Sequence, residues 1–235
     1  MLGPLDYALW LAGFVMQLAV VATIFWRRAV LRYSLIVVYM LCAALVQGTQ
    51  FIYLLKYGIT SRQYYFAYYY LENVLTLLLF FVVIQLCHRV FALIGASRYV
   101  RVAAALLVTG TALISYFVIR GHREHMTKDF VIQFGQDIYF VGVVLTYLLW
   151  VVILRLRNRP ARLTQVVLAL GIYFGATAVV YALRNLFPAL ENGFFLYGLP
   201  ISGLWLPVAW TYTFLRTPDG ESPAARLTPS SNGPA

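Results

Sequence analysis

The sequence predicts an all-α protein, a polytopic transmembrane bundle of about seven helices. Three observations lead to this prediction. First, 62% of the 235 residues are hydrophobic and only 11% are charged, whereas a soluble domain is about half apolar and about a quarter charged. Second, the mean hydropathy is +0.79. Third, the apolar residues fall in runs of about 20 residues, the length that a helix needs to cross a bilayer.

Each apolar run is bounded by charged residues or by Gly and Pro. The seven predicted spans are Leu5–Trp26, Tyr33–Leu55, Tyr64–Cys87, Val100–Ile119, Phe130–Leu154, Leu163–Leu186 and Gly193–Leu215. The connections are short, so consecutive spans should pack as antiparallel neighbours. Residues 1–216 are therefore predicted to form one transmembrane domain. Residues 217–235, rich in Pro, Ser and Gly, are predicted to be a disordered cytoplasmic tail.

The basic residues indicate the orientation, because cytoplasmic loops carry an excess of Lys and Arg. An outside N-terminus and an inside C-terminus place twelve of the eighteen basic residues on the inner side: Arg27, Arg28, Arg32, Arg89, Arg98, Arg101, Arg155, Arg157, Arg159, Arg162, Arg216 and Arg226. These residues form short clusters between apolar runs. The net charge of +10 therefore reflects membrane topology rather than nucleic-acid binding.

The third span carries the most informative acidic residue. It opens with an aromatic cluster that begins at Tyr64, and Glu72 follows about 12 Å further along a helix. An ionisable group at that depth costs about 2.5–3.5 kcal/mol on insertion scales, so it needs a partner or a purpose.

The last two spans contain small residues and helix breakers. Gly171 and Gly175 in the sixth span form a small-xxx-small pair suited to close helix contact. The seventh span contains Gly198, Pro200, Gly203 and Pro207 and is predicted to be kinked or locally unwound.

Polar side chains from several spans should meet in the outer half of the bundle. Two acids and one arginine are costly apart in hydrocarbon and tolerable together. Arg184 could pair with one carboxylate. The other acid would then be protonated or would be free to bind a cation or a ligand amine. The predicted ligand-binding or proton site is Glu72, Asp137, Arg184, Gln47, Gln133, Tyr69 and Tyr181. The alternative is a polar network that only fixes the register of the helices.

Enzyme signatures are missing from the sequence. It contains no H-E-x-x-H, G-x-S-x-G, P-loop or C-x-x-C motif. The seventh span has no lysine, which excludes a rhodopsin-like Schiff base. His122 and His125 have a spacing that can bind a metal on a helix, but the sequence fixes no further ligand. We therefore predict no catalytic activity, no cofactor and no metal.

Two stretches carry a resemblance to known proteins. They are RRAVLRYSLIVVYM, from Arg27, and YYFAYYYLENVLTLLLFFVVIQLCHRVF, from Tyr64. With the helix count, they resemble uncharacterised small bacterial seven-helix membrane proteins and, more distantly, the seven-helix membrane regions of sensor histidine kinases. The resemblance implies a multi-pass protein of the bacterial inner (plasma) membrane. A short tail stands where a kinase domain would follow, so signalling would pass through a cytoplasmic or membrane partner.

Three functional interpretations follow from the sequence. The first is a sensor-like or partner-binding membrane protein with an outward polar site for a small ligand. The second is a small transporter or proton-coupled carrier that uses the same acids. The third is a structural or assembly protein without a ligand. All three have the lipid bilayer as a partner and none involves nucleic acid.

Overall fold

The computed structural model describes residues 4–58, 61–92, 102, 106–107, 109–111, 113, 126–156, 160–186 and 194–217, and the side chains within 4–6, 126–136, 181–182, 184–186 and 194–200 lie outside this description. The described part is all-helical. Its long helices are α1 (Pro4–Trp26), α2 (Ser34–Tyr57), α3 (Arg62–Ala92), α5 (Met126–Arg155), α6 (Ala161–Leu186) and α7 (Phe194–Arg216).

These bounds confirm the all-α class, and the six long helices of the described part coincide with six of the seven predicted spans. Within the described residues, α1, α2, α3, α5 and α6 each contain a stretch long and apolar enough to cross a membrane. At the fourth predicted span, residues 102, 106–107, 109–111 and 113 are helical, and the rest of that span lies outside the described residues. Residues 218–235, which include all but one residue of the predicted tail, also lie outside them.

The seventh predicted helix is continuous. Residues from Phe194 to Arg216 are α-helical, including Pro200, Gly203 and Pro207, so the expected local unwinding does not occur. The physical reason is tertiary packing, because α7 lies against both α1 and α6. Neighbouring helices can hold a proline-containing helix in register within a membrane.

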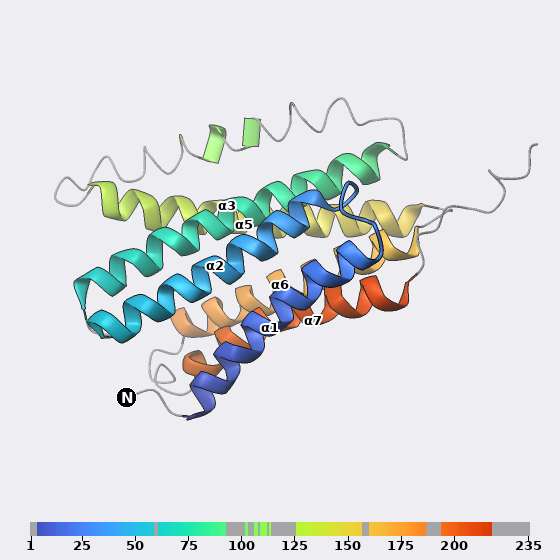
Figure 1. Ribbon diagram of the computed structural model, residues 1–235. Helices are drawn as coiled ribbons and strands as arrows, with labels where there is room; N and C mark the ends of the chain where they lie inside the picture. The colour runs from blue at the N-terminus through green and yellow to red at the C-terminus, as the bar shows by residue number, and fades with distance from the viewer. Residues whose placement is uncertain are drawn as a thin grey trace, which may run out of the picture.

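The long helices lie side by side (Figure 1), and their contacts close a ring. Following the contacts around the ring, α1 packs on α2, α2 on α3, α3 on α5, α5 on α6, α6 on α7, and α7 on α1. Helices α1, α3, α5 and α7 finish at the same end of the bundle, where α2 and α6 begin (Figure 1). We call this the arginine-rich end, because Arg27, Arg89, Arg155, Arg162 and Arg216 lie there, and the other the opposite end.

Backbone hydrogen bonds and a residue with positive φ end α1 at the arginine-rich end. The Arg28 amide donates to the Phe25 carbonyl and the Ala29 amide to the Ile24 carbonyl, the hydrogen-bond pair of a Schellman motif. Arg28 occupies the left-handed position, with φ 51°. Ala29 and Ile24 are both buried and supply the apolar contact that accompanies this motif.

At the opposite end, a glycine and a serine connect α2 to α3. Gly58 follows α2 with φ 78°, a conformation that glycine adopts without steric cost. The Tyr64 amide then donates to the Ser61 hydroxyl oxygen over 3.1 Å. This is the N-cap bond that satisfies one of the free amides at the start of α3.

Gly171 and Gly175 on α6 pack against Trp150 and Tyr147 of α5. A Cβ on Gly171 would lie 2.6 Å from the Trp150 ring, and one on Gly175 would lie 2.9 Å from the Tyr147 hydroxyl. The Trp150 indole N–H donates to the Val167 carbonyl over 2.9 Å. The predicted role of Gly171 and Gly175 in close helix contact is confirmed.

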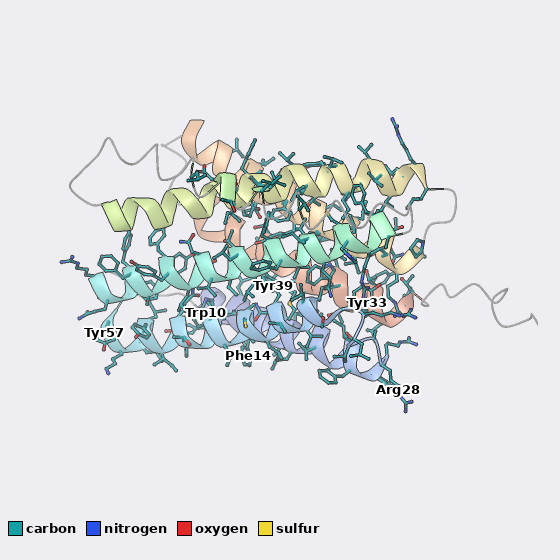
Figure 2. All side chains as sticks on the ribbon, turned by 90° about the horizontal axis from the view of Figure 1, so that it is seen from above. Trp10, Phe14, Arg28, Tyr33, Tyr39 and Tyr57 are labelled. Carbon is teal, nitrogen blue, oxygen red and sulfur yellow. The ribbon has the colours of Figure 1, made fainter. Side chains whose placement is uncertain are left out.

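Along α3, the buried side chains that the structure describes lie toward the arginine-rich end. The buried residues of α3 begin at Leu79 and continue to Val90, and residues 62–78 are half-buried or exposed. On α2 the buried residues run from Ile36 to Gln50 and stop there. Figure 2 shows Tyr33 and Tyr39 among the helices, and Tyr57 at the far end of α2.

Candidate functional site

The centre of the candidate site is a hydrogen bond between α2 and α3. The Gln50 side-chain amide donates to Oε1 of Glu72 over 3.1 Å. Gln50 is buried, with 6% of its surface exposed, whereas Glu72 is half-buried. Among the described residues no Lys or Arg forms an ion pair with this carboxylate. The described partner of Glu72 is therefore neutral, and the residue keeps accessible surface.

Local sequence explains how α3 presents Glu72. The residue is the eleventh of α3, about 15 Å along the helix from Arg62 at 1.5 Å per residue. The Thr76 hydroxyl donates to the Glu72 carbonyl over 2.9 Å. This bond lies within the helix, so it leaves the Glu72 carboxylate available for contacts with other helices or with a ligand.

Tyrosine rings occupy the segment of α3 between Glu72 and the opposite end. Tyr65 and Tyr69 are one helical turn apart, with ring centroids 4.4 Å apart. Tyr64 and Tyr68 form a second pair at 6.1 Å, and Tyr64 lies within electrostatic range of Glu72. Aromatic faces beside a carboxylate suit a cationic group, because the rings and the carboxylate both attract positive charge.

On the other side of Glu72, toward the arginine-rich end, aromatic residues fill the interior. The Tyr39 hydroxyl lies within electrostatic range of Glu72 and of Tyr173 on α6. The Tyr39 ring meets the Trp210 ring edge-on at 6.3 Å, and Tyr33 meets Phe214 at 4.9 Å. We call Tyr33, Tyr39, Trp210 and Phe214 the buried aromatic cluster, since all four are under 9% exposed.

Two arginines flank the buried aromatic cluster. The Arg89 guanidinium lies 4.5 Å from the centre of the Tyr33 ring, and that of Arg162 lies 5.7 Å from the centre of the Phe214 ring. Arg162 is itself buried and donates two hydrogen bonds to the Thr217 carbonyl. The contacts from Arg89 through Tyr33 and Phe214 to Arg162 join α3, the α1–α2 connection, α7 and α6.

The predicted site residues separate into groups. Gln47 contacts α1, because its side-chain amide donates to the Trp10 carbonyl over 2.8 Å. Tyr69 lies on the aromatic segment of α3. Asp137 is half-buried on α5, which packs on α3 and runs in the same direction. The side chains of Gln133, Tyr181 and Arg184 lie outside the described residues, so convergence of Glu72, Asp137 and Arg184 stays a prediction.

The sequence-based site omits the described partner of Glu72. Gln50 lies three residues after Gln47, and this spacing alone places both on one side of α2. Tyr39 on α2 also interacts electrostatically with Glu72 on α3 and with Tyr173 on α6, and no spacing rule links residues on different helices. Equal depth on consecutive spans would have selected Gln47 as the partner of Glu72, because both lie eight residues from the outer ends of their predicted spans, whereas Gln50 lies five residues from that end.

The comparisons with known proteins add no relative. No family model, no curated protein and no solved structure matches the chain.

Proposed function

We propose that this protein is a sensor-like integral membrane protein that binds a small cation or ligand amine at Glu72. In this proposal the chain crosses the bacterial plasma membrane seven times, with the opposite end of the bundle outside and the arginine-rich end in the cytoplasm. A membrane or cytoplasmic partner receives the signal. The excess of basic residues at the arginine-rich end supports this orientation.

One observation carries the proposal. Glu72 keeps accessible surface, and its described hydrogen-bond partner is the neutral amide of Gln50. A carboxylate within a membrane span is costly unless a positive charge or several donors compensate it. A cationic ligand would supply that charge, and the tyrosine rings of α3 would add cation–π attraction.

The packing of the bundle favours a sensor over a carrier. The side of Glu72 toward the opposite end carries half-exposed tyrosine side chains. The side toward the arginine-rich end carries the buried aromatic cluster and its flanking arginines. A ligand entering from the opposite end would meet packed side chains beyond Glu72, which suits a site that holds a ligand rather than one that passes it through.

Thermal unfolding of the purified protein in lipid nanodiscs tests the proposal, with tetramethylammonium chloride as the probe and sodium chloride at equal ionic strength as the control. Binding to the folded state raises the midpoint of unfolding, and the stabilisation grows with the ligand concentration L as RT ln(1 + L/Kd). We expect tetramethylammonium to stabilise the wild type and to have no effect on Glu72→Gln. The substitution keeps the shape of the side chain and removes its charge.

A matched variant separates the site from a general effect of charge. Asp137→Asn removes the other acidic side chain assigned to the predicted site and keeps the charge of Glu72. This variant should therefore keep the shift that tetramethylammonium causes in the wild type. A shift that survives in Glu72→Gln would overturn the proposal. If the wild type carries the probe into sealed vesicles and Glu72→Gln abolishes this flux, the same carboxylate would instead belong to a carrier. If the wild type shows no shift and Glu72→Gln is less stable than the wild type, the hydrogen bond between Gln50 and Glu72 would only stabilise the helix packing.

A further inference from the structure

A second charged site lies at the arginine-rich end, where α1 and α7 finish. Arg27, Arg28 and Arg216 are all exposed there. The Arg27 guanidinium donates to the Leu215 carbonyl, which brings the end of α1 beside Arg216. We call these three residues the α1–α7 arginine cluster. The acidic side chains that the structure describes, Glu72 and Asp137, lie in the other half of the bundle.

The positive φ of Arg28 indicates that the Arg28 side chain has a function. Arg28 has φ 51° at the left-handed position of the Schellman motif, where glycine is the usual residue. A residue with a Cβ is strained in this conformation. Strain of this kind persists mainly at functional positions. Figure 2 shows Arg28 at the end of the bundle, directed away from the helices.

Apolar side chains flank the α1–α7 arginine cluster on the outer surface. Phe25 is 56% exposed and Trp26 is 82% exposed at the end of α1. On α7, Tyr212 is exposed, and the Arg216 guanidinium lies 5.2 Å from the centre of its ring. An exposed apolar surface that ends in several guanidinium groups matches an amphiphile with an anionic head and apolar chains.

From this geometry we infer that the α1–α7 arginine cluster binds the phosphate headgroup of an anionic phospholipid. The guanidinium groups of Arg28 and Arg216 hold the phosphate oxygens, and planar guanidinium donors suit that geometry. The acyl chains lie along Phe25, Trp26 and Tyr212. An acidic protein would match the charge and leave these apolar side chains uncovered. The inference is independent of the Glu72 site and of which leaflet the cluster faces.

Native mass spectrometry tests the inference on protein taken from vesicles that contain phosphatidylcholine and phosphatidylglycerol. We expect the wild type to retain phosphatidylglycerol in preference to phosphatidylcholine. In Arg28→Gln/Arg216→Gln, retention of phosphatidylglycerol should fall roughly tenfold to thirtyfold, since juxtamembrane arginines contribute additively to anionic-lipid binding. Arg28→Lys/Arg216→Lys keeps the positive charge and should retain most of the preference.

The matched control removes two basic residues at the opposite end. Lys56 and Arg62 are exposed, and each lies 5.3 Å from the centre of a neighbouring aromatic ring, as Arg216 lies over Tyr212. Lys56→Gln/Arg62→Gln should leave the lipid preference unchanged. Equal losses in the two double variants would overturn the inference, as would equal retention of the two lipids by the wild type. Displacement of the bound lipid by poly-glutamate in the wild type would assign the cluster to an acidic protein and would also overturn it.

Discussion

The two ends of α3 are packed differently. Near the arginine-rich end the buried side chains of α3 run from Leu79 to Val90, and aromatic rings and guanidinium groups contact one another across the interior. Near the opposite end α3 carries half-exposed and exposed tyrosine side chains and one carboxylate. The part of α3 near the arginine-rich end is therefore more tightly packed than the part that carries Glu72.

The difference has a physical basis in how membrane helices associate. Within lipid, apolar burial gives little net attraction between helices, so close packing and interhelical hydrogen bonds hold them together. The α5–α6 contact at Gly171 and the buried aromatic cluster meet that requirement. At the opposite end, the described interhelical bond of Glu72 is a single contact with Gln50. A site supported by so few contacts can rearrange around a ligand at low cost.

The largest expected effect comes from removing a ring of the buried aromatic cluster. Phe214 is 0% exposed and contacts both Tyr33 and Arg162. Phe214→Ala should destabilise the protein by on the order of 3–5 kcal/mol, because it leaves a cavity and removes the stack. The control is Tyr70→Ala, at the opposite end, where the side chain is 45% exposed. Thermal unfolding in a mild detergent measures both, and equal losses would contradict this difference in packing.

A smaller loss is expected from Gly171→Ala. The added methyl group would lie 2.6 Å from atoms of the Trp150 ring, so α5 and α6 must move apart or the indole must give up its bond to Val167. Overpacking of this kind costs about 1–3 kcal/mol. Gly203→Ala is the matched control, because a Cβ there meets nothing within 4 Å. It should be neutral or slightly stabilising by the same unfolding measurement.

Sequence patterns predict the helices well, because each depends on local properties. Run length and flanking charge are enough to place α1 to within a residue or two, and the Gly171–Gly175 spacing is enough to predict a close contact. The continuity of α7 through Pro200 and Pro207 depends on packing against α1 and α6, which local pattern does not reveal.

The candidate site was harder to predict than the helices. Gln47 and Gln50 are one turn apart, but three residues rotate a helix by about 300°, so their side chains differ by about 60° in direction. Because α2 packs between α1 and α3, that difference sends Gln47 to Trp10 and Gln50 to Glu72. Spacing identifies a shared side of the helix, and only the positions of the neighbouring helices decide the partner.

Loss of the amide that holds Glu72 should have a modest effect on stability. Gln50→Leu removes the 3.1 Å bond between α2 and α3, and interhelical hydrogen bonds in membranes are worth about 0.6–1.7 kcal/mol. Thr49→Val on the same helix removes only a bond within α2, to the Leu45 carbonyl, and should change stability less. Titration with a denaturing detergent measures both variants. A loss of several kcal/mol in Gln50→Leu would mean that contacts near the opposite end also hold the helices together.

The smallest expected effect is a gain, and it tests whether strain at the arginine-rich end serves a purpose. Arg28→Gly relieves the left-handed conformation at φ 51° and should stabilise the protein in neutral detergent by about 0.5–1 kcal/mol. Arg28→Ala keeps most of the strain and removes the charge, so it should be near neutral there. In nanodiscs containing phosphatidylglycerol, both variants should lose lipid contacts that the wild type keeps, and the advantage of Arg28→Gly over the wild type should shrink. An advantage of equal size in detergent and in anionic nanodiscs would show that the strained arginine contributes nothing to lipid binding.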